Sequence, residues 1–81
     1  MRRIESGELL DLGTAVQVGS RIGHVVSAAI VPSRPSGTVA AHRIRFEARL
    51  RVAMTRGGRR TVREDISPVE EPVSYVAIWV V

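Results

Sequence analysis

Arginine recurs at nearly every second position between residues 42 and 52, and this spacing is the strongest chemical signal in the chain. Arg43, Arg45, Arg49 and Arg51 alternate with apolar or acidic residues in the run HRIRFEARLRV. A guanidinium group can bind phosphate or carboxylate with two parallel hydrogen bonds, so the row indicates contact with nucleic-acid backbone or with an acidic protein surface. The alternative is that it forms only the solvent side of a strand, with GC-rich codon use explaining twelve arginines and no lysine.

A second basic cluster follows at Gly57-Gly58, where Arg59 and Arg60 flank an expected hairpin tip. The candidate interface with protein or nucleic acid therefore consists of Arg43, Arg45, Arg49, Arg51, Arg59 and Arg60. Exposed aromatic residues do not interleave with these arginines, because the alternation places Phe46 on the apolar face. The pattern predicts at most phosphate contact without base reading.

The other reactive residue types do not assemble into a catalytic set. The only histidines, His24 and His42, lack a third ligand at useful spacing, and the paired acids at 64–65 and 70–71 are better explained by ion pairs with arginine. Serine-nucleophile motifs and phosphate-binding glycine loops are absent from the sequence. We therefore predict no enzyme, no catalytic residue, no metal site and no cofactor.

Size and composition describe one small domain. A chain of 81 residues buries only about 60% of the surface of its unfolded form, and no disulfide can reinforce it because it has no cysteine. The net charge is +4. We expect no secretory signal, and the longest apolar run, residues 76–81, is too short to cross a membrane. The expected location is a virion or the cytoplasm.

Beyond Gly13 the sequence is rich in valine, isoleucine, threonine and arginine, with turn residues between the runs, which is typical of β-structure. We predict an N-terminal arm or short helix over 1–13 and a β-barrel domain over 14–81. The predicted strands are residues 14–18, 21–31, 38–55, 60–66 and 73–81, separated by turns at 19–20, 32–37, 57–59 and 67–72. The fold class is all-β, a small five-stranded barrel.

The register of the hairpin between the third and fourth strands can be predicted from its apolar residues. A three-residue loop places Met54 opposite Val62, and Arg51 opposite Asp65. A two-residue loop places Val52 opposite Arg63 and puts charge on the apolar face. The first register is favoured because a slip of one residue turns every side chain to the other face.

The last predicted strand is apolar on both sides, which indicates either a central strand or one covered by a neighbouring subunit. Under the second reading, the chain forms oligomers through its arm, the 32–37 loop and its C-terminal strand. The candidate oligomer contacts are Ile4, Leu9, Leu10, Tyr75, Ile78, Trp79 and Val80.

Three stretches together resemble a small SH3-like barrel of the KOW or Tudor kind: residues 16–26, the strand ending at 42–52, and residues 62–70. In such barrels an early glycine bend opens the second strand and a short 3₁₀ turn precedes the last one; here Ile66-Ser-Pro-Val69 matches that turn. Compact chains with this barrel, an arm and a long loop are similar to tailed-phage head–tail connector or head-completion proteins. That resemblance implies a ring subunit.

Our leading hypothesis is a non-catalytic structural subunit of a phage-like particle, a connector, completion or decoration protein with homo- and hetero-oligomeric partners. The rival is a nucleic-acid-binding SH3-like module that uses the arginine-rich strand and hairpin. A third reading is an adaptor that docks on an acidic protein surface. None of the three involves a membrane.

Overall fold

The computed structural model describes residues 1–47, 50–55, 57–63 and 69–81. Within these ranges the chain forms strands and one short 3₁₀ turn, which confirms the all-β prediction. In chain order the elements are β1 (Arg2–Arg3), β2 (Ala15–Val18), β3 (Arg21–Pro32), β4 (Thr38–Phe46), β5 (Leu50–Thr55), β6 (Gly58–Arg63), β7 (Val69–Ser74), the 3₁₀ turn η1 (Tyr75–Ala77) and β8 (Trp79–Val80).

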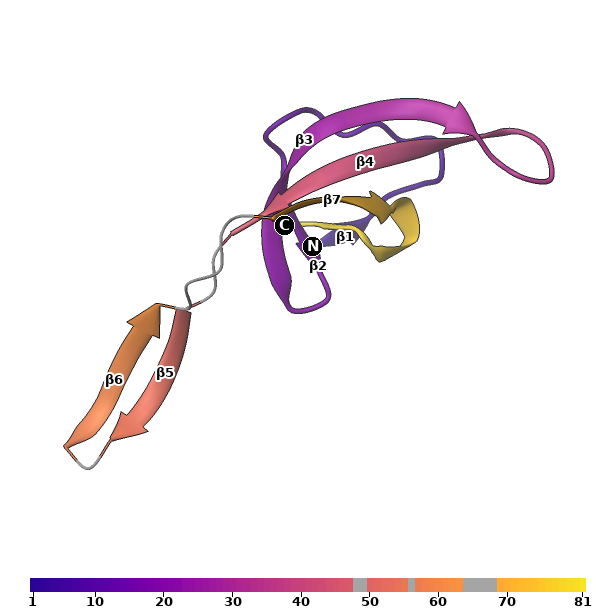
Figure 1. Cartoon of the computed structure of the whole chain (residues 1–81). Helices are drawn as coiled ribbons and strands as arrows, with labels where there is room; N and C mark the ends of the chain where they lie inside the picture. The colour runs from indigo at the N-terminus through magenta and orange to yellow at the C-terminus, as the bar shows by residue number, and fades with distance from the viewer. Residues whose placement is uncertain (48–49, 56, 64–68) are drawn as a thin grey trace.

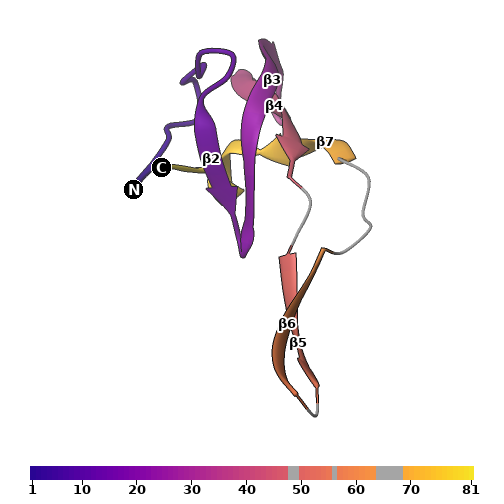
Figure 2. The same cartoon turned by 90° about the vertical axis from the view of Figure 1, so that its left-hand side faces the viewer.

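Six of the strands form one open antiparallel sheet in the order β1-β8-β2-β3-β4-β7 (Figure 1). β1 and β7 are therefore its two edges. The prediction from sequence was instead a closed five-stranded barrel, which has no free edges. Among the described residues, β5 and β6 pair only with each other and form a separate two-stranded sheet, which extends away from the six-stranded sheet (Figure 2).

The first hairpin matches its sequence prediction. Val18 pairs with Arg21, so Gly19 and Ser20 form the connection between β2 and β3. Gly19 has φ +61°, a left-handed conformation that glycine adopts without steric cost. β3 then runs to Pro32 and pairs with β4 along its length, with a bulge between Val25 and Ser27.

The predicted third strand, residues 38–55, is two strands in two different sheets. β4 ends at Phe46 after pairing with β3 and β7, whereas β5 starts at Leu50 and pairs with β6. The alternating pattern continues across the break because alternation at a period of two indicates only that the backbone is extended. It does not indicate which strand is the pairing partner. The long basic strand predicted from residues 42–52 was therefore wrong.

The predicted hairpin register was also wrong. Met54 pairs with Arg59 and Arg51 with Val62, while Thr55 pairs with Gly58. The prediction assumed an apolar face buried against a core. The two-stranded sheet is not part of the six-stranded sheet that holds the core, so this driving force does not fix its register. The other half of the predicted Arg51 pair, Asp65, lies outside the described residues.

The C-terminal segment is not one strand over 73–81. β7 already spans Val69–Ser74, η1 follows at Tyr75–Ala77, and β8 is only two residues long. The chain must pass from one edge of the sheet to a strand between β1 and β2, and η1 provides that change of direction. The 3₁₀ turn is therefore later than predicted, and residues 64–68 lie outside the described residues.

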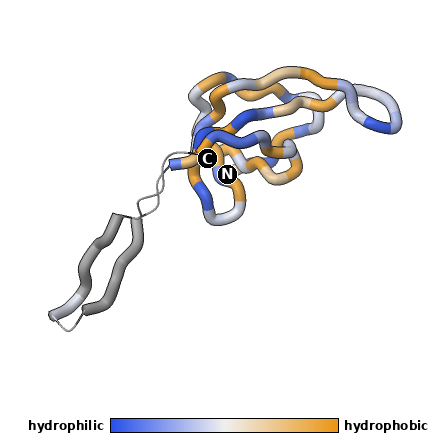
Figure 3. Tube along the Cα trace, in the orientation of Figure 1, coloured by the Kyte–Doolittle hydropathy of each residue, from blue (hydrophilic) through white to orange (hydrophobic). Residues whose placement is uncertain are grey.

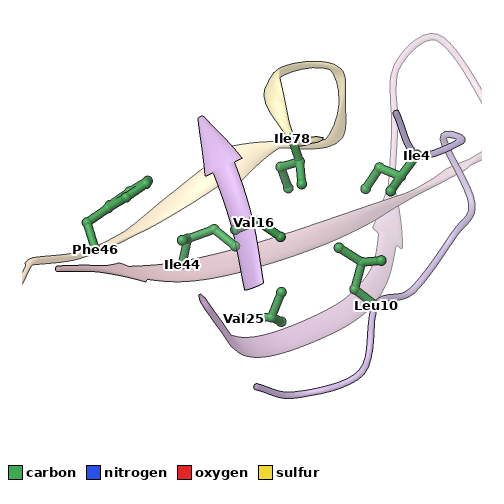
Figure 4. Packing of buried hydrophobic residues seen from close by; sticks show 7 residues of the cluster. All are labelled: Ile4, Leu10, Val16, Val25, Ile44, Phe46 and Ile78. Carbon is green, nitrogen blue, oxygen red and sulfur yellow. The ribbon is translucent and has the colours of Figure 1, made fainter. Parts of the chain in front are cut away.

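The hydrophobic core lies on the inner side of this sheet (Figure 4). Val16, Val25 and Ile44 are almost completely buried at its centre, with Phe46 at one end. Together with Ile78, which follows η1, they supply large apolar side chains from four different strand or turn regions. Each such side chain contributes about 1.5–3 kcal/mol on burial.

Residues 1–13 form no helix; they pack as an extended arm on the sheet. Ile4 and Leu10 enter the core, and the amide of Ala40 donates to the carbonyl oxygen of Ser6 at 2.7 Å. The amide of Gly13 donates to Val25 at 2.8 Å. The arm therefore completes the core of its own chain.

Candidate contact surfaces

Two of the predicted interface arginines lie side by side on the outer face of β4. The side chains of Arg43 and Arg45 are 50% and 49% exposed. The carboxylate of Glu70, on β7, is 3.9 Å from Arg43 Nε and 3.6 Å from Arg45 Nη1. Exposed pairs of this kind contribute only about 0–1 kcal/mol each, but the carboxylate halves the net charge of this part of the surface.

Three other arginines of the predicted set are not on this surface. Arg51 is on β5, and Arg59 and Arg60 are on β6, in the separate hairpin. Arg49 lies outside the described residues. The five described arginines of the predicted interface are therefore divided between two sheets.

Positive charge is concentrated in the hairpin. Residues 50–63 contain five arginines and no acidic residue, whereas residues 1–47 and 69–81 contain six arginines and six acidic residues. The part of the chain that holds the six-stranded sheet is therefore neutral. The hairpin carries more positive charge than the net +4 of the whole chain.

Three of the predicted oligomer contacts are buried in the chain's own core. Ile4 is 6% exposed, Leu10 is 8% exposed and Ile78 is fully buried. Their side chains fill the space between the arm, the sheet and η1, so they are not available to a neighbouring subunit. Their apolar character reflects folding of the monomer.

The remaining predicted oligomer contacts are accessible to different degrees. Leu9 is 48% and Trp79 37% exposed, whereas Tyr75 and Val80 are half-buried against the core. The guanidinium carbon of Arg3 lies 5.1 Å from the centre of the Trp79 ring, which is a cation–π contact.

Sequence reasoning missed a row of side chains across four strands of the outer face, defined by register. Arg3 on β1 pairs with Trp79 on β8, Trp79 with Gln17 on β2, and Gln17 with Ile22 on β3. Ile22 is 45% exposed. Residues directly opposite on neighbouring strands share a face, so this outer row places an exposed aliphatic residue and the only tryptophan on one surface. Hydrophobic and hydrophilic residues alternate along the strands of this sheet (Figure 3).

His42 is the buried polar residue of the core, with 2% exposure. Its Nε2 accepts a hydrogen bond from the amide of Leu10 at 3.1 Å, and Nδ1 has no partner among the described residues. Burial lowers the pKa of His42 because the imidazolium form loses its hydration; the charge of Glu8 opposes this effect. The sequence alternation could have placed His42 on the apolar face, because His42 is separated from Ile44 and Phe46 by an even number of positions along the strand.

A second polar contact, an ion pair between two strands that are not neighbours, lies at the other end of the core. Arg21, at the start of β3, forms an ion pair with Glu71 on β7, although β4 lies between these strands. The guanidinium of Arg21 also lies over the ring of Phe46, 3.7 Å from its centre. No sequence pattern signals this contact, because it joins strands that are distant in sequence and are not neighbours in the sheet.

The arm carries its own ion pair. Arg2 and Glu8 approach to 2.6 Å, and the hydrogen bond from Arg2 lowers the pKa of the Glu8 carboxyl group. This pair lies within the arm, whereas the Leu10–His42 hydrogen bond and the Ala40–Ser6 hydrogen bond join the arm to β4.

A shallow pocket of about 300 Å³ lies beside β4, between residues 39–42 and 72–75. His42, Ser74 and Tyr75 are the polar side chains in its lining, which is otherwise valine, alanine and proline. No group of three or more potential metal ligands occurs in the described ranges. The part of the chain that the structure describes also contains no helix with the length and apolarity that membrane crossing requires.

Comparisons with family models, with curated proteins and with solved structures found no match.

Proposed function

We propose that the chain is a non-catalytic structural subunit of a larger assembly, acting through homo- and hetero-oligomeric contacts. The observation that carries the proposal is the amount of surface the monomer leaves exposed. The chain exposes 6056 Å², whereas a compact monomer of its 8.8 kDa exposes about 4,800 Å². The excess of about 1,300 Å² on one chain is more than the roughly 800 Å² that each partner buries in a standard protein–protein interface.

The shape supports the same conclusion. The molecule measures 58 × 23 × 23 Å, and its radius of gyration of 16.1 Å exceeds the roughly 12 Å of a compact domain of this length. An elongated small domain with a separate hairpin gains little stability from its own core. Contacts with neighbouring subunits supply what the core does not.

We assign the contact surface on the six-stranded sheet to the outer row formed by Arg3, Trp79, Gln17 and Ile22. Tryptophan and arginine are enriched among residues that dominate binding energy at interfaces. The edges of the sheet are less suited to pairing with another chain. β1 has only two residues, both arginine, and β7 carries Pro72 and two glutamates, features that protect exposed edges.

We further propose that the sheet is a variant of the small SH3-like barrel. The order β8-β2-β3-β4-β7 and the 3₁₀ turn before the last strand support this relationship. By resemblance, the assembly is a tailed-phage virion, with the chain as a head–tail connector, completion or decoration protein. This places its site of action in the particle or, before assembly, in the host cytoplasm.

Two isoleucines of β3 provide a matched test of the contact surface. Ile22 and Ile30 are 45% and 46% exposed, but only Ile22 belongs to the outer row. We expect Ile22→Glu to dissociate the oligomer and Ile30→Glu to leave it intact, as measured by sedimentation velocity. Dissociation by both variants, or by neither, would contradict the assigned surface. A monomeric wild-type chain would contradict the proposed function itself.

A further inference from the structure

The β5–β6 hairpin requires a partner. A two-stranded hairpin alone is at best marginally stable in water, because it has no third strand or helix against which to pack. Here β5 and β6 are hydrogen-bonded only to each other within the described residues (Figure 1). The identity of the partner follows from the charge of the hairpin.

A second copy of this chain is a poor electrostatic match. The region holding the six-stranded sheet has equal numbers of arginines and acidic residues. Of those acids, Glu8, Glu70 and Glu71 already form ion pairs with arginines of the same region. The hairpin of another copy carries the same five arginines and repels the first.

Arginines lie along both strands of the hairpin. Arg51 pairs with Val62 and Arg60 with Ala53, whereas Arg59 pairs with Met54 and Arg63 with Leu50. Positive charge is therefore present along the whole length of the paired strands, as phosphates are along a duplex.

The dimensions also suit a duplex. Six residues of strand extend about 20 Å, and a DNA duplex carries about twelve phosphates over that length. The major groove, about 12 Å wide, accepts a two-stranded β-ribbon. Residues 50–63 include no aromatic residue for stacking on single strands and no asparagine or glutamine for reading adenine.

We propose that the β5–β6 hairpin is a nucleic-acid-binding arm that lies in a duplex groove and contacts phosphates through Arg51, Arg59, Arg60 and Arg63, with little sequence preference. This goes beyond the proposed function and does not rest on it, since one hairpin of a monomer can bind. Four phosphate contacts predict that log K falls with log salt with a slope of about −3.6. Affinity therefore falls about 150-fold between 50 and 200 mM salt.

The test is fluorescence anisotropy of a labelled 20-base-pair duplex of mixed sequence, titrated with the full chain at several salt concentrations. The variant pair is Arg59→Gln/Arg60→Gln in the hairpin and Arg43→Gln/Arg45→Gln on β4, each of which removes two charges. The hairpin variant should reduce the slope to about −1.8 and weaken binding at least tenfold at 50 mM salt. The β4 variant should leave the slope unchanged.

Three results would overturn the proposal: no binding by the wild-type chain at 50 mM salt, equal weakening by both variants, or equally tight binding of polyglutamate in a competition experiment. The last result would identify an acidic protein as the partner. Circular dichroism of each variant confirms that the sheet is intact. Failure here leaves the sedimentation result for Ile22→Glu unaffected, so the two proposals can fail separately.

Discussion

The hydrogen bond between the Leu10 amide and His42 Nε2 predicts a specific dependence of stability on pH. Nε2 can accept this bond only when it carries no proton, so the folded chain requires neutral His42. Protonation removes the acceptor for Leu10 and places a charge in the core beside the arm. Replacing the imidazole with an apolar ring, as in His42→Phe, removes the acceptor without adding a charge.

The sign and size follow from the lowered pKa of His42. In the unfolded chain histidine titrates near 6.5, so below this pH the unfolded state binds more protons than the folded state and stability decreases. The decrease continues until pH reaches the lower pKa of the folded state, with a limiting slope of about 1.4 kcal/mol per pH unit. In His42→Phe the buried Leu10 amide loses its acceptor, which costs about 1–3 kcal/mol at pH 7.5.

Urea denaturation followed by fluorescence of Trp79 measures both effects at pH 5.5, 6.5 and 7.5. Titration of Glu8 does not affect measurements between pH 5.5 and 7.5. Its pKa is lowered in the folded chain, so its contribution to stability is complete above about pH 4.5, the ordinary pKa of the group. His24→Gln is the control, because His24 is the only other histidine and is not one of the buried residues of the core. We expect His42→Phe to lose the pH dependence and His24→Gln to keep it. Equal pH dependence in wild type and His42→Phe would refute the reasoning.

Two further substitutions test the packing of the sheet. A methyl group at Gly23 would lie closer than 3.0 Å to the carbonyl oxygen of Arg45, so Gly23→Ala should cost about 3 kcal/mol in urea denaturation; Gly7→Ala, where nothing lies within 4 Å, should cost under 1 kcal/mol. Similar losses for both would contradict the close approach of β3 and β4. Arg21→Ala removes the ion pair with Glu71 and the stacking on an aromatic ring, so we expect a loss of about 1–2 kcal/mol. An unchanged urea midpoint would show that these contacts of Arg21 contribute nothing to stability.

Local patterns predicted local structure well. The β2–β3 hairpin could be predicted because a glycine-containing turn at residues 19–20 separates two runs of β-formers. Both strands lie within one residue of their expected bounds. The all-β class follows from the same composition, since β-branched residues pack well on a pleated surface.

What the patterns could not predict is which segments pair with which. Alternation continues from β4 into β5 without a signal for the break after Phe46, so one predicted strand became two. Apolar residues on both sides of 73–81 indicated a continuous strand, although the chain must turn at η1 to pass from β7 to β8. Partner choice depends on residues distant in sequence, which a single sequence does not reveal.

The candidate sites show the same limit. Ile4 and Leu10 were assigned to oligomer contacts because the phage proteins that the chain resembles bind neighbouring subunits through their arms, whereas the structure places both residues in the core of their own chain. Conversely, the outer row joins residues from four strands and could not be found without the register. The exposure of Arg43 and Arg45 and the basic character of the hairpin could be recognised from sequence alone.

We propose above that neighbouring subunits cover part of the exposed surface of this small chain, at the outer row of the six-stranded sheet. Light scattering of the purified wild-type chain over a hundredfold range of concentration tests it most directly. We expect a mass that is a multiple of 8.8 kDa at the upper end of the range. A single species of 8.8 kDa at every concentration would contradict it.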